Sequence, residues 1–279
     1  MDDQVTQNYY SSKSIQEFYL NVWGGDSIHI GIYDDDYIYS ANQDKKSKIN
    51  DIRVSANLKK KLMFNKIEKY HPDLHLINIA DFGAGYGGTS RYLYKQLKEQ
   101  NNKFTLDCFD ISKENCMVNT EQNIVNNYDI NVLHTSFLDI PFSKKYNIIY
   151  SEDAFIHINN RELIFKQIDK ILLKNGLFIF SDIILTDTHN LNEIQEVYDR
   201  INITNIETTA SYIEKAMRYN LKLLEEYEYK ESMLLHYSNV KDCVENTPEN
   251  QQILVGLKSW IKHITLGNIT SKLLVFRKL

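Results

Sequence analysis

From residue 77 onward, short apolar runs alternate with stretches of helical periodicity. The runs cover residues 77–82, 104–109, 132–135, 146–150 and 177–180, and amphipathic patterns cover 89–99 and 161–173. Nearly continuous apolar runs are typical of strands buried on both faces. Their alternation with helices favours a parallel sheet covered on both sides. We therefore expect an α/β fold built on a doubly wound, mostly parallel sheet.

The segments on either side of this alternation predict helices and two more strands. Residues 13–23 and 48–70 carry apolar side chains at helical spacing, and so does the stretch 188–220. Two late apolar segments, 223–229 and 272–276, indicate further strands. We expect an N-terminal helical cap over residues 1–75 and a core over 76–279, interrupted by a helical insertion at about 185–220. The insertion and the N-terminal helices together are a candidate lid over the carboxyl edge of the sheet.

A glycine-rich segment, D-F-G-A-G-Y-G-G at 81–88, ends the first predicted strand and opens the first helix of the alternation. Glycine lets a backbone turn tightly and approach a ligand closely. The pattern G-x-G-x-x-G alone also fits nicotinamide enzymes. Asp81 would face a positively charged end of a bound nucleoside cofactor. Asp110, at the end of the second strand, would accept both ribose hydroxyls, which indicates a nucleoside without fixing the chemistry.

The third predicted strand is followed by S-F-L-D-I-P at 136–141. Asp139 would accept a hydrogen bond from an adenine amino group, and Phe137 or Leu138 would pack on the ring. A helix cap at a loop explains the same residues equally well.

These segments, with D-I-S at 110–112 and Y-S-E-D-A-F-I-H at 150–157, resemble the ordered motifs of class I S-adenosylmethionine-dependent methyltransferases. The resemblance covers residues 77–182. It implies a seven-stranded, Rossmann-like methyltransferase sheet whose last strand is antiparallel, with S-adenosyl-L-methionine as the cofactor. K-N-G-L at 174–177 replaces the family's usual Pro-Gly-Gly turn. The implied cofactor-binding residues are Asp81, Gly83, Ala84, Gly85, Asp110, Ile111, Phe137, Leu138, Asp139 and Ser151.

A narrower resemblance extends over nearly the whole chain. N-Y-Y at 8–10, F-Y-x-x-V-W-G-G-D-x-I-H-x-G-x-Y at 18–33 and L-L-H-Y-S-x-V-K at 234–241 are similar to sarcosine/dimethylglycine N-methyltransferases. They are less closely similar to tocopherol-type C-methyltransferases. The first likeness implies N-methylation of sarcosine or dimethylglycine toward betaine. The alternatives are C- or O-methylation of a tocopherol-like, prenyl or phenolic acceptor, or a non-catalytic protein that binds a nucleoside cofactor.

Candidate catalytic and substrate-binding residues follow from the chemistry of methyl transfer. His157 is the only histidine near the carboxyl end of the fourth strand, and it is either a base or hydrogen-bond partner or a structural residue. Glu152 is either cofactor wall or a solvated acid, and Arg53, Arg200 and Arg218 are all available to a substrate carboxylate. Aromatic faces attract methylammonium groups. The candidate substrate-binding residues are Tyr9, Tyr10, Trp23, His29, Tyr33, Asp153, His236 and Tyr237.

Composition excludes several other classes of protein. The net charge is −5, with acidic and basic residues interleaved, which disfavours nucleic acid as a partner. No apolar run approaches the ~18 residues of a membrane span, and the acidic N-terminus lacks secretory features, so we expect a cytoplasmic protein. Three cysteines without a Cys-x-x-Cys pair predict no metal site. The expected partner is a small-molecule methyl acceptor; a homodimer is compatible with the sequence, which does not fix the oligomeric state.

Overall fold

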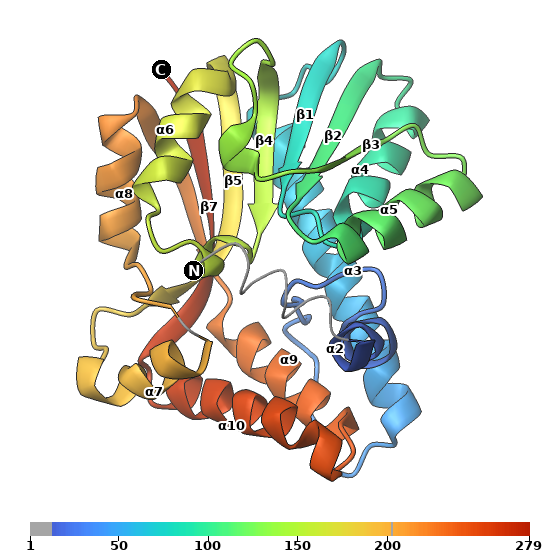
Figure 1. The fold of residues 1–279 in the computed structure, drawn as a ribbon, viewed down its shortest axis with the longest axis vertical. Coiled ribbons are helices and arrows are strands. Elements are labelled where there is room, and N and C mark those ends of the chain that lie inside the picture. Colours follow the sequence, from blue (N-terminus) through green and yellow to red (C-terminus); the bar gives the residue numbers. More distant parts are fainter. Residues whose placement is uncertain (1–12, 202) are drawn as a thin grey trace.

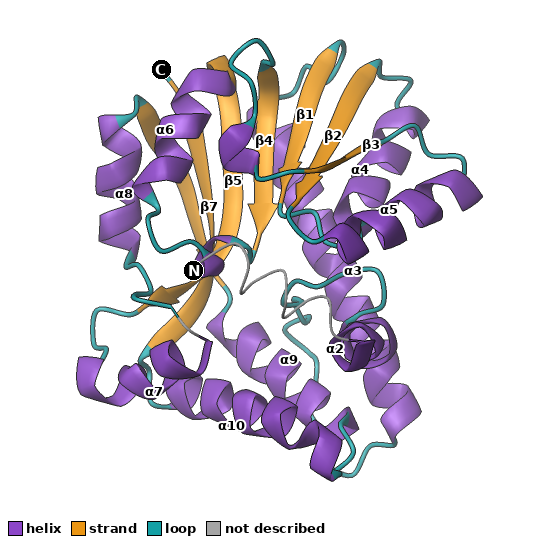
Figure 2. Cartoon of the chain, in the orientation of Figure 1, coloured by secondary structure: helices purple, strands orange, loops and turns teal. Residues whose placement is uncertain are grey.

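One seven-stranded sheet organises the described part of the chain, which is residues 13–201 and 203–279 of the computed structural model (Figures 1 and 2). The strand order is β3-β2-β1-β4-β5-β7-β6, and β7 alone runs antiparallel to its neighbours. The expected fold class, including the antiparallel last strand, is therefore confirmed. The strands are β1 Ile77–Phe82, β2 Phe104–Asp110, β3 Asn131–His134, β4 Tyr146–Glu152, β5 Leu172–Leu185, β6 Leu221–Glu228 and β7 Ile269–Lys278.

The helices include the expected ones and three that the apolar pattern does not predict. They are α2 Lys13–Phe18, α3 Lys45–Tyr70, α4 Gly88–Glu99, α5 Lys113–Val125, α6 Glu162–Ile171, α7 Leu191–Ile201, α8 Thr209–Arg218, α9 Lys230–Cys243 and α10 Gln251–Thr265, with short turns η1 Tyr19–Trp23, η2 Phe137–Asp139 and η3 Phe155–His157. The pattern misses α5 because most of its buried side chains are asparagines, Asn115, Asn119 and Asn123. It misses α9 because polar residues such as Ser232 and Asn239 share the buried face.

Helices cover both faces of the sheet. Ile148 of β4 packs in a cluster with Met63 of α3, whereas its neighbour Ile149 packs in a second cluster with Phe165 of α6. This alternation follows from the pleat, which points successive side chains to opposite faces. The sheet is thus buried on both sides, with α3 and α4 on one face and α6 and α8 on the other.

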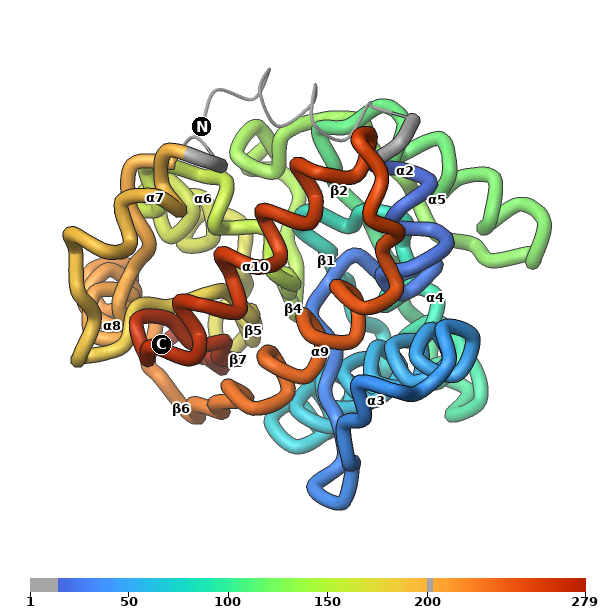
Figure 3. The backbone as a smooth tube through the Cα atoms, turned by 90° about the horizontal axis from the view of Figure 1, so that it is seen from below, coloured from blue at the N-terminus to red at the C-terminus, as the bar shows by residue number. Residues whose placement is uncertain are grey.

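A helical layer lies beyond the carboxyl ends of β1 and β4. It contains α2, α7, α9 and α10, and α10 crosses this end of the molecule (Figures 1 and 3). The expected insertion divides between two places, since α8 packs on β6 and α6 while α7 packs on α10. No helix among residues 13–201 and 203–279 is long and apolar enough to cross a bilayer.

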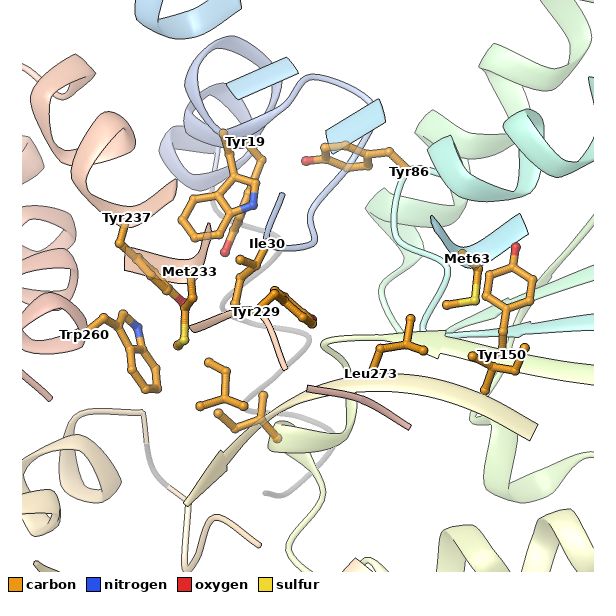
Figure 4. Close-up of a cluster of buried hydrophobic side chains, with 14 of the residues drawn as sticks. Tyr19, Ile30, Met63, Tyr86, Tyr150, Tyr229, Met233, Tyr237, Trp260 and Leu273 are labelled. Atoms are coloured by element: carbon orange, nitrogen blue, oxygen red, sulfur yellow. The ribbon is translucent and has the colours of Figure 1, made fainter. Parts of the chain in front are cut away.

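Aromatic packing joins this layer to the N-terminal segment (Figure 4). The rings of Trp23 and Tyr237 are 5.5 Å apart, and those of Tyr237 and Trp260 are 6.0 Å apart. These residues belong to the same hydrophobic cluster as Ile148 and Tyr150 of the sheet. The layer therefore packs as a continuation of the core, which positions its polar side chains above the strand ends.

Candidate active site

The glycine-rich loop between β1 and α4 is shaped for close backbone contact. Gly83 and Gly85 have φ values of 72° and 54°, a left-handed conformation that glycine adopts without strain. A Cβ at Gly88 would lie 2.4 Å from the backbone oxygen of Asp26, so the segment that crosses the loop leaves no room for a side chain. The amide of Ala84 donates to the Phe109 oxygen at 3.0 Å, which ties the loop to the end of β2.

Asp110, at the end of β2, connects two loops. Its Oδ2 accepts the backbone N–H of Gly85 at 2.8 Å, and its Oδ1 accepts that of Ser112 at 2.8 Å. Burial raises its pKa, although the two amides oppose the shift. The acid that the sequence assigns to the ribose therefore also fixes the glycine loop against the second strand. Ile111, beside it, is half-buried. Its backbone oxygen accepts a hydrogen bond from His134 Nε2 at 3.1 Å.

Asp81 is buried at the end of β1. Its Oδ2 accepts hydrogen bonds from Ser90 Oγ at 2.7 Å and Tyr150 Oη at 2.9 Å. Burial raises the pKa of Asp81 to about 7, while these two hydroxyls work against the increase. A cation bound nearby would favour the ionised carboxylate, because opposite charges lower an acid's pKa.

The other residues expected to bind the cofactor lie at the same edge of the sheet. Phe137 is buried and stacks on Phe82 with ring centroids 4.7 Å apart, and Ser136 caps the short turn η2. Asp139 is exposed and Leu138 is half-buried. Ser151 is buried and donates to the Phe82 oxygen at 2.7 Å, so its hydroxyl joins β4 to β1.

A cavity of about 30 Å³ lies against the glycine loop, and the segment 26–29 covers it. Ile28 Cδ1 lies 3.0 Å from the position that a Cβ at Gly85 would take. Asp26 anchors the cover through Lys60 of α3 at 2.8 Å and Arg91 of α4 at 3.5 Å. Ligand pockets usually enclose ~300–1,000 Å³, so the segment has to move before a nucleoside cofactor enters. The lining residues are Asp26, Ser27, Ile28, His29, Asp81, Gly83, Ala84, Gly85, Gly88, Thr89 and Glu152.

Two hydrogen-bond acceptors, one from His29 and one from Glu152, face one another at the edge of this cavity. The Nδ1–H of His29 donates to the Ile30 oxygen at 3.3 Å, which leaves a lone pair on Nε2. Burial lowers the pKa of His29, so the ring is neutral and its 3.8 Å approach to Glu152 Oε2 is not an ion pair. Thr89 Oγ1 donates to Glu152 Oε2 at 2.5 Å. His29 Nε2 and Glu152 Oε1 are buried without a hydrogen-bond partner among the described residues.

Asp153 holds the covering segment in place. It has a φ of 55°, unusual for a residue other than glycine. Its Oδ2 accepts the backbone N–H of Ile30 at 2.8 Å, and its Oδ1 accepts the Ser181 hydroxyl at 2.7 Å. Both oxygens are thus used to position the backbone that carries His29.

The structure brings most of the expected substrate residues together. Trp23 Nε1 donates to the His29 oxygen at 3.1 Å, and its ring centroid lies 4.8 Å from that of His236. The backbone N–H of Tyr33 donates to Ser232 Oγ of α9 at 3.0 Å. Direct contacts, or contacts through the backbone of residues 30 and 31, connect six of the expected residues into one neighbourhood: Trp23, His29, Tyr33, Asp153, His236 and Tyr237.

Several expected residues lie elsewhere. Tyr9 and Tyr10 are outside the described residues, as is the side chain of Arg200. His157 lies on η3, does not line the cavity, and has its pKa lowered to about 4 by burial and by Arg161. Arg53 is exposed, and Arg218 is exposed with Glu162 at 2.7 Å.

Residues that the sequence analysis missed complete the neighbourhood. They are Lys59 of α3, Ser181 of β5 and Tyr229, which precedes α9. Lys59 carried a signal, because it falls at helical spacing on the buried face shared by Ile52, Ala56 and Met63. The sequence gives no such signal for Ser181 and Tyr229, since their role depends on strand pairing between distant segments.

The fold, the glycine loop and the acids at the ends of β1 and β2 define a class I S-adenosylmethionine-dependent methyltransferase. A family model described as a methyltransferase domain matches residues 80–180. The sarcosine/dimethylglycine N-methyltransferases of Aphanothece halophytica and Halorhodospira halochloris are 30% and 26% identical, over 98% and 99% of this chain and 96% and 98% of theirs. A structure assigned as a sarcosine dimethylglycine methyltransferase from Galdieria sulphuraria superposes with a TM-score of 0.82 at 27% identity, covering 94% of this chain and 97% of that one.

The chain belongs to the sarcosine/dimethylglycine N-methyltransferase family. It is an enzyme that uses S-adenosylmethionine to methylate a small molecule. The glycine loop, Asp81 and Asp110 fit this cofactor, because they offer a close backbone approach and carboxylates at the two expected strand ends.

Proposed function

We propose that the enzyme methylates the nitrogen of sarcosine or dimethylglycine, forming betaine as the final product. The observation that carries the proposal is the pair of buried acceptors, His29 Nε2 and Glu152, at the edge of the cofactor cavity. Two acceptors facing one space suit a group that is, or becomes, positively charged. An amine acceptor has this property, whereas a phenol does not.

The chemistry asks the protein mainly for orientation and electrostatics. S-adenosylmethionine supplies a methyl carbon that is already activated by the positive sulfur, and transfer is an in-line displacement. The nitrogen gains positive charge as it forms the new bond. The carboxylate of Glu152, buried beside the cavity, stabilises that charge as it develops.

We assign His29, and not His157, to the position next to the substrate nitrogen. Its Nε2 lone pair lies in the cavity wall, where it accepts a hydrogen bond from a substrate N–H or takes the proton that an ammonium must lose before it reacts. The Trp23 ring, held against the His29 backbone, provides an aromatic face for the methylammonium product. The rate should rise with pH as the substrate nitrogen deprotonates.

Mass spectrometry of separate reactions with sarcosine, dimethylglycine, phosphoethanolamine, a phenol and a prenyl diphosphate tests the proposal. We expect methylated product from the two glycine derivatives. Turnover of another acceptor with no product from either glycine derivative would contradict the proposal and favour the C- or O-methyltransferase alternative.

A further inference from the structure

Among the described residues, most buried cations have a carboxylate or several hydrogen-bond acceptors as partners, and one is an exception. Buried charges need partners, because moving an unpaired ion out of water costs free energy. Lys48 lies 2.5 Å from Asp242, and Lys60 and Arg91 share Asp26. Arg161 has no carboxylate within 4.0 Å among the described residues, but its guanidinium donates to the Asn205 side chain at 3.0 Å and to two backbone oxygens at 3.1 Å, which leaves Nε without a partner.

Lys59 is the exception. Its side chain is 0% exposed, and its ammonium donates one hydrogen bond, to Tyr229 Oη at 2.5 Å. No described carboxylate oxygen lies within 4.0 Å of its Nζ. An ammonium has three donors, so Lys59 keeps donor capacity and a positive charge without a matching anion.

A second buried donor belongs to the same neighbourhood. His236 of α9 is 0% exposed, and its Nδ1 accepts the backbone N–H of Gly31 at 3.2 Å. Burial, followed by the charges of His29 and Lys59, lowers the pKa of His236 to about 3, so the ring is neutral. The proton of this neutral ring is therefore on Nε2, which has no hydrogen-bond partner among the described residues.

The position of these donors relative to the reacting end follows from their neighbours. Gly31 donates its backbone N–H to His236, and the next residue, Ile32, donates its own to the Ser55 oxygen at 2.9 Å, one helical turn before Lys59 on α3. Tyr229, which receives the Lys59 hydrogen bond and is drawn with Ile30 and Met233 in Figure 4, feels the charges of Asp153 and Glu152. Gly31 connects His236 to the segment that carries His29, through the hydrogen bond from its backbone N–H. A Cβ at Gly31 would lie 2.0 Å from Ser55 Oγ, so the backbone at this position packs closely against α3.

We propose that Lys59, with Tyr229 and the Nε2–H of His236, forms the subsite that binds the carboxylate of the methyl acceptor. The inference rests on the proposed function, because it assigns the acid end of the same amino-acid substrate. The site then has matching polarity: acceptors from His29 and Glu152 at the cavity face the nitrogen. The donors of Lys59 and His236, which lie outside the lining of the present cavity, face the carboxylate once the covering segment moves. Arg53 and Arg218 are exposed, whereas Lys59 is buried against Tyr229.

Calorimetric binding to the S-adenosylhomocysteine complex tests the subsite, with N,N-dimethylglycine and N,N-dimethylglycinamide, which lacks the carboxylate charge, as probes. The wild-type enzyme should bind the acid more tightly than the amide by about 10- to 100-fold, the range for hydrogen bonds to charged groups. Lys59→Met should remove most of that preference while changing amide binding little. Lys59→Gln keeps a hydrogen-bond donor without the charge, so it should retain a small part of the preference for the acid. This variant replaces Lys59→Met in the test if the methionine variant does not fold.

Lys48→Met is the matched control, because it removes another buried lysine from the same face of α3. It should lower the Tm, since Asp242 loses a partner, and leave the acid preference unchanged. Lys59→Met should not lower the Tm of the unliganded enzyme, since it removes an unpaired buried charge. No acid preference in the wild-type enzyme, or full preference in both Lys59 variants, would overturn the subsite. Acid preference without methylated product would overturn the proposed function and leave the subsite standing.

Discussion

The two halves of the proposed active site are built in different ways. The cofactor half centres on the β1–α4–β2 unit, where backbone amides of Gly85 and Ser112 meet the side chain of Asp110. The acceptor half consists of side chains from α3, β4, β5 and α9, held together by an N-terminal segment. Its contacts span the chain, as in the hydrogen bond between Gly31 and His236, 205 residues apart. A change in the first half should therefore alter donor binding, and a change in the second should alter turnover and acceptor choice.

The largest expected effect lies in the acceptor half. Glu152→Gln should lower kcat by about 10²–10³-fold, the cost typical of losing an electrostatic stabiliser of the transition state. The glutamine still accepts the Thr89 hydroxyl, so affinity for S-adenosylmethionine should change little. Initial rates with dimethylglycine, alongside Glu162→Gln on the surface of α6, provide the measurement and its control. A large loss of donor affinity with unchanged kcat would place Glu152 in the cofactor half.

The next effect isolates the cofactor half. Asp110→Ala should weaken S-adenosylmethionine binding by ~1–3 kcal/mol, the usual range for leaving polar partners unpaired. At saturating donor, kcat should stay close to that of the wild-type enzyme. Calorimetry measures the affinity, and Asp107→Asn, on the same strand but paired with Lys144 and Tyr146, is the control. Unchanged affinity in Asp110→Ala would remove this acid from the cofactor site.

The pH dependence of donor binding sharpens the comparison further. Burial raises the pKa of Asp81 to about 7, and the cationic donor should favour its ionised form. Affinity should therefore increase about tenfold between pH ~6 and ~8, and Asp81→Asn should flatten the curve. Calorimetry across that pH range makes the measurement. A flat wild-type profile would show that Asp81 does not meet a cation.

Ionisation of Asp81 should strengthen donor binding as the pH rises, but it should lower the stability of the unliganded protein. Because the pKa of Asp81 in the folded unliganded protein, about 7, exceeds the ordinary value of 3.8, its contribution to stability is complete below 3.8 and is lost as the pH rises through 7. Asp182, buried beneath α8 with a pKa also raised to about 7, adds a loss of the same sign. Thermal unfolding of the unliganded enzyme should show this decline, and saturating donor should reduce the part that belongs to Asp81.

The smallest expected effect concerns His157. It does not line the cavity, so His157→Gln should change kcat for an amine acceptor by only ~2–3-fold, far below the ~10²–10⁴-fold of a lost general base. Steady-state kinetics with dimethylglycine is the measurement, and His29→Gln is the informative companion. A loss of the larger size would return the acid–base role to His157.

The cofactor half was predictable because its residues lie close together in the sequence. Asp81, the glycines and Asp110 follow from apolar runs and turn chemistry within thirty positions. The acceptor half was accessible only through a family resemblance, which supplied Trp23, His29 and His236 but not their contacts. Lys59 belongs to a run of three lysines, a pattern typical of a solvated helix face, whereas its Nζ is buried against Tyr229. Polar residues on buried helix faces hide such sites from any analysis that equates burial with apolar character.

Transfer of a carbon-labelled methyl group from S-adenosylmethionine to dimethylglycine, followed by NMR of the product, tests the central claim most directly. The enzyme should place the label on the quaternary nitrogen of betaine, and the yield should fall sharply in Glu152→Gln. An enzyme that binds S-adenosylmethionine through Asp110 but transfers no label to dimethylglycine would contradict the claim.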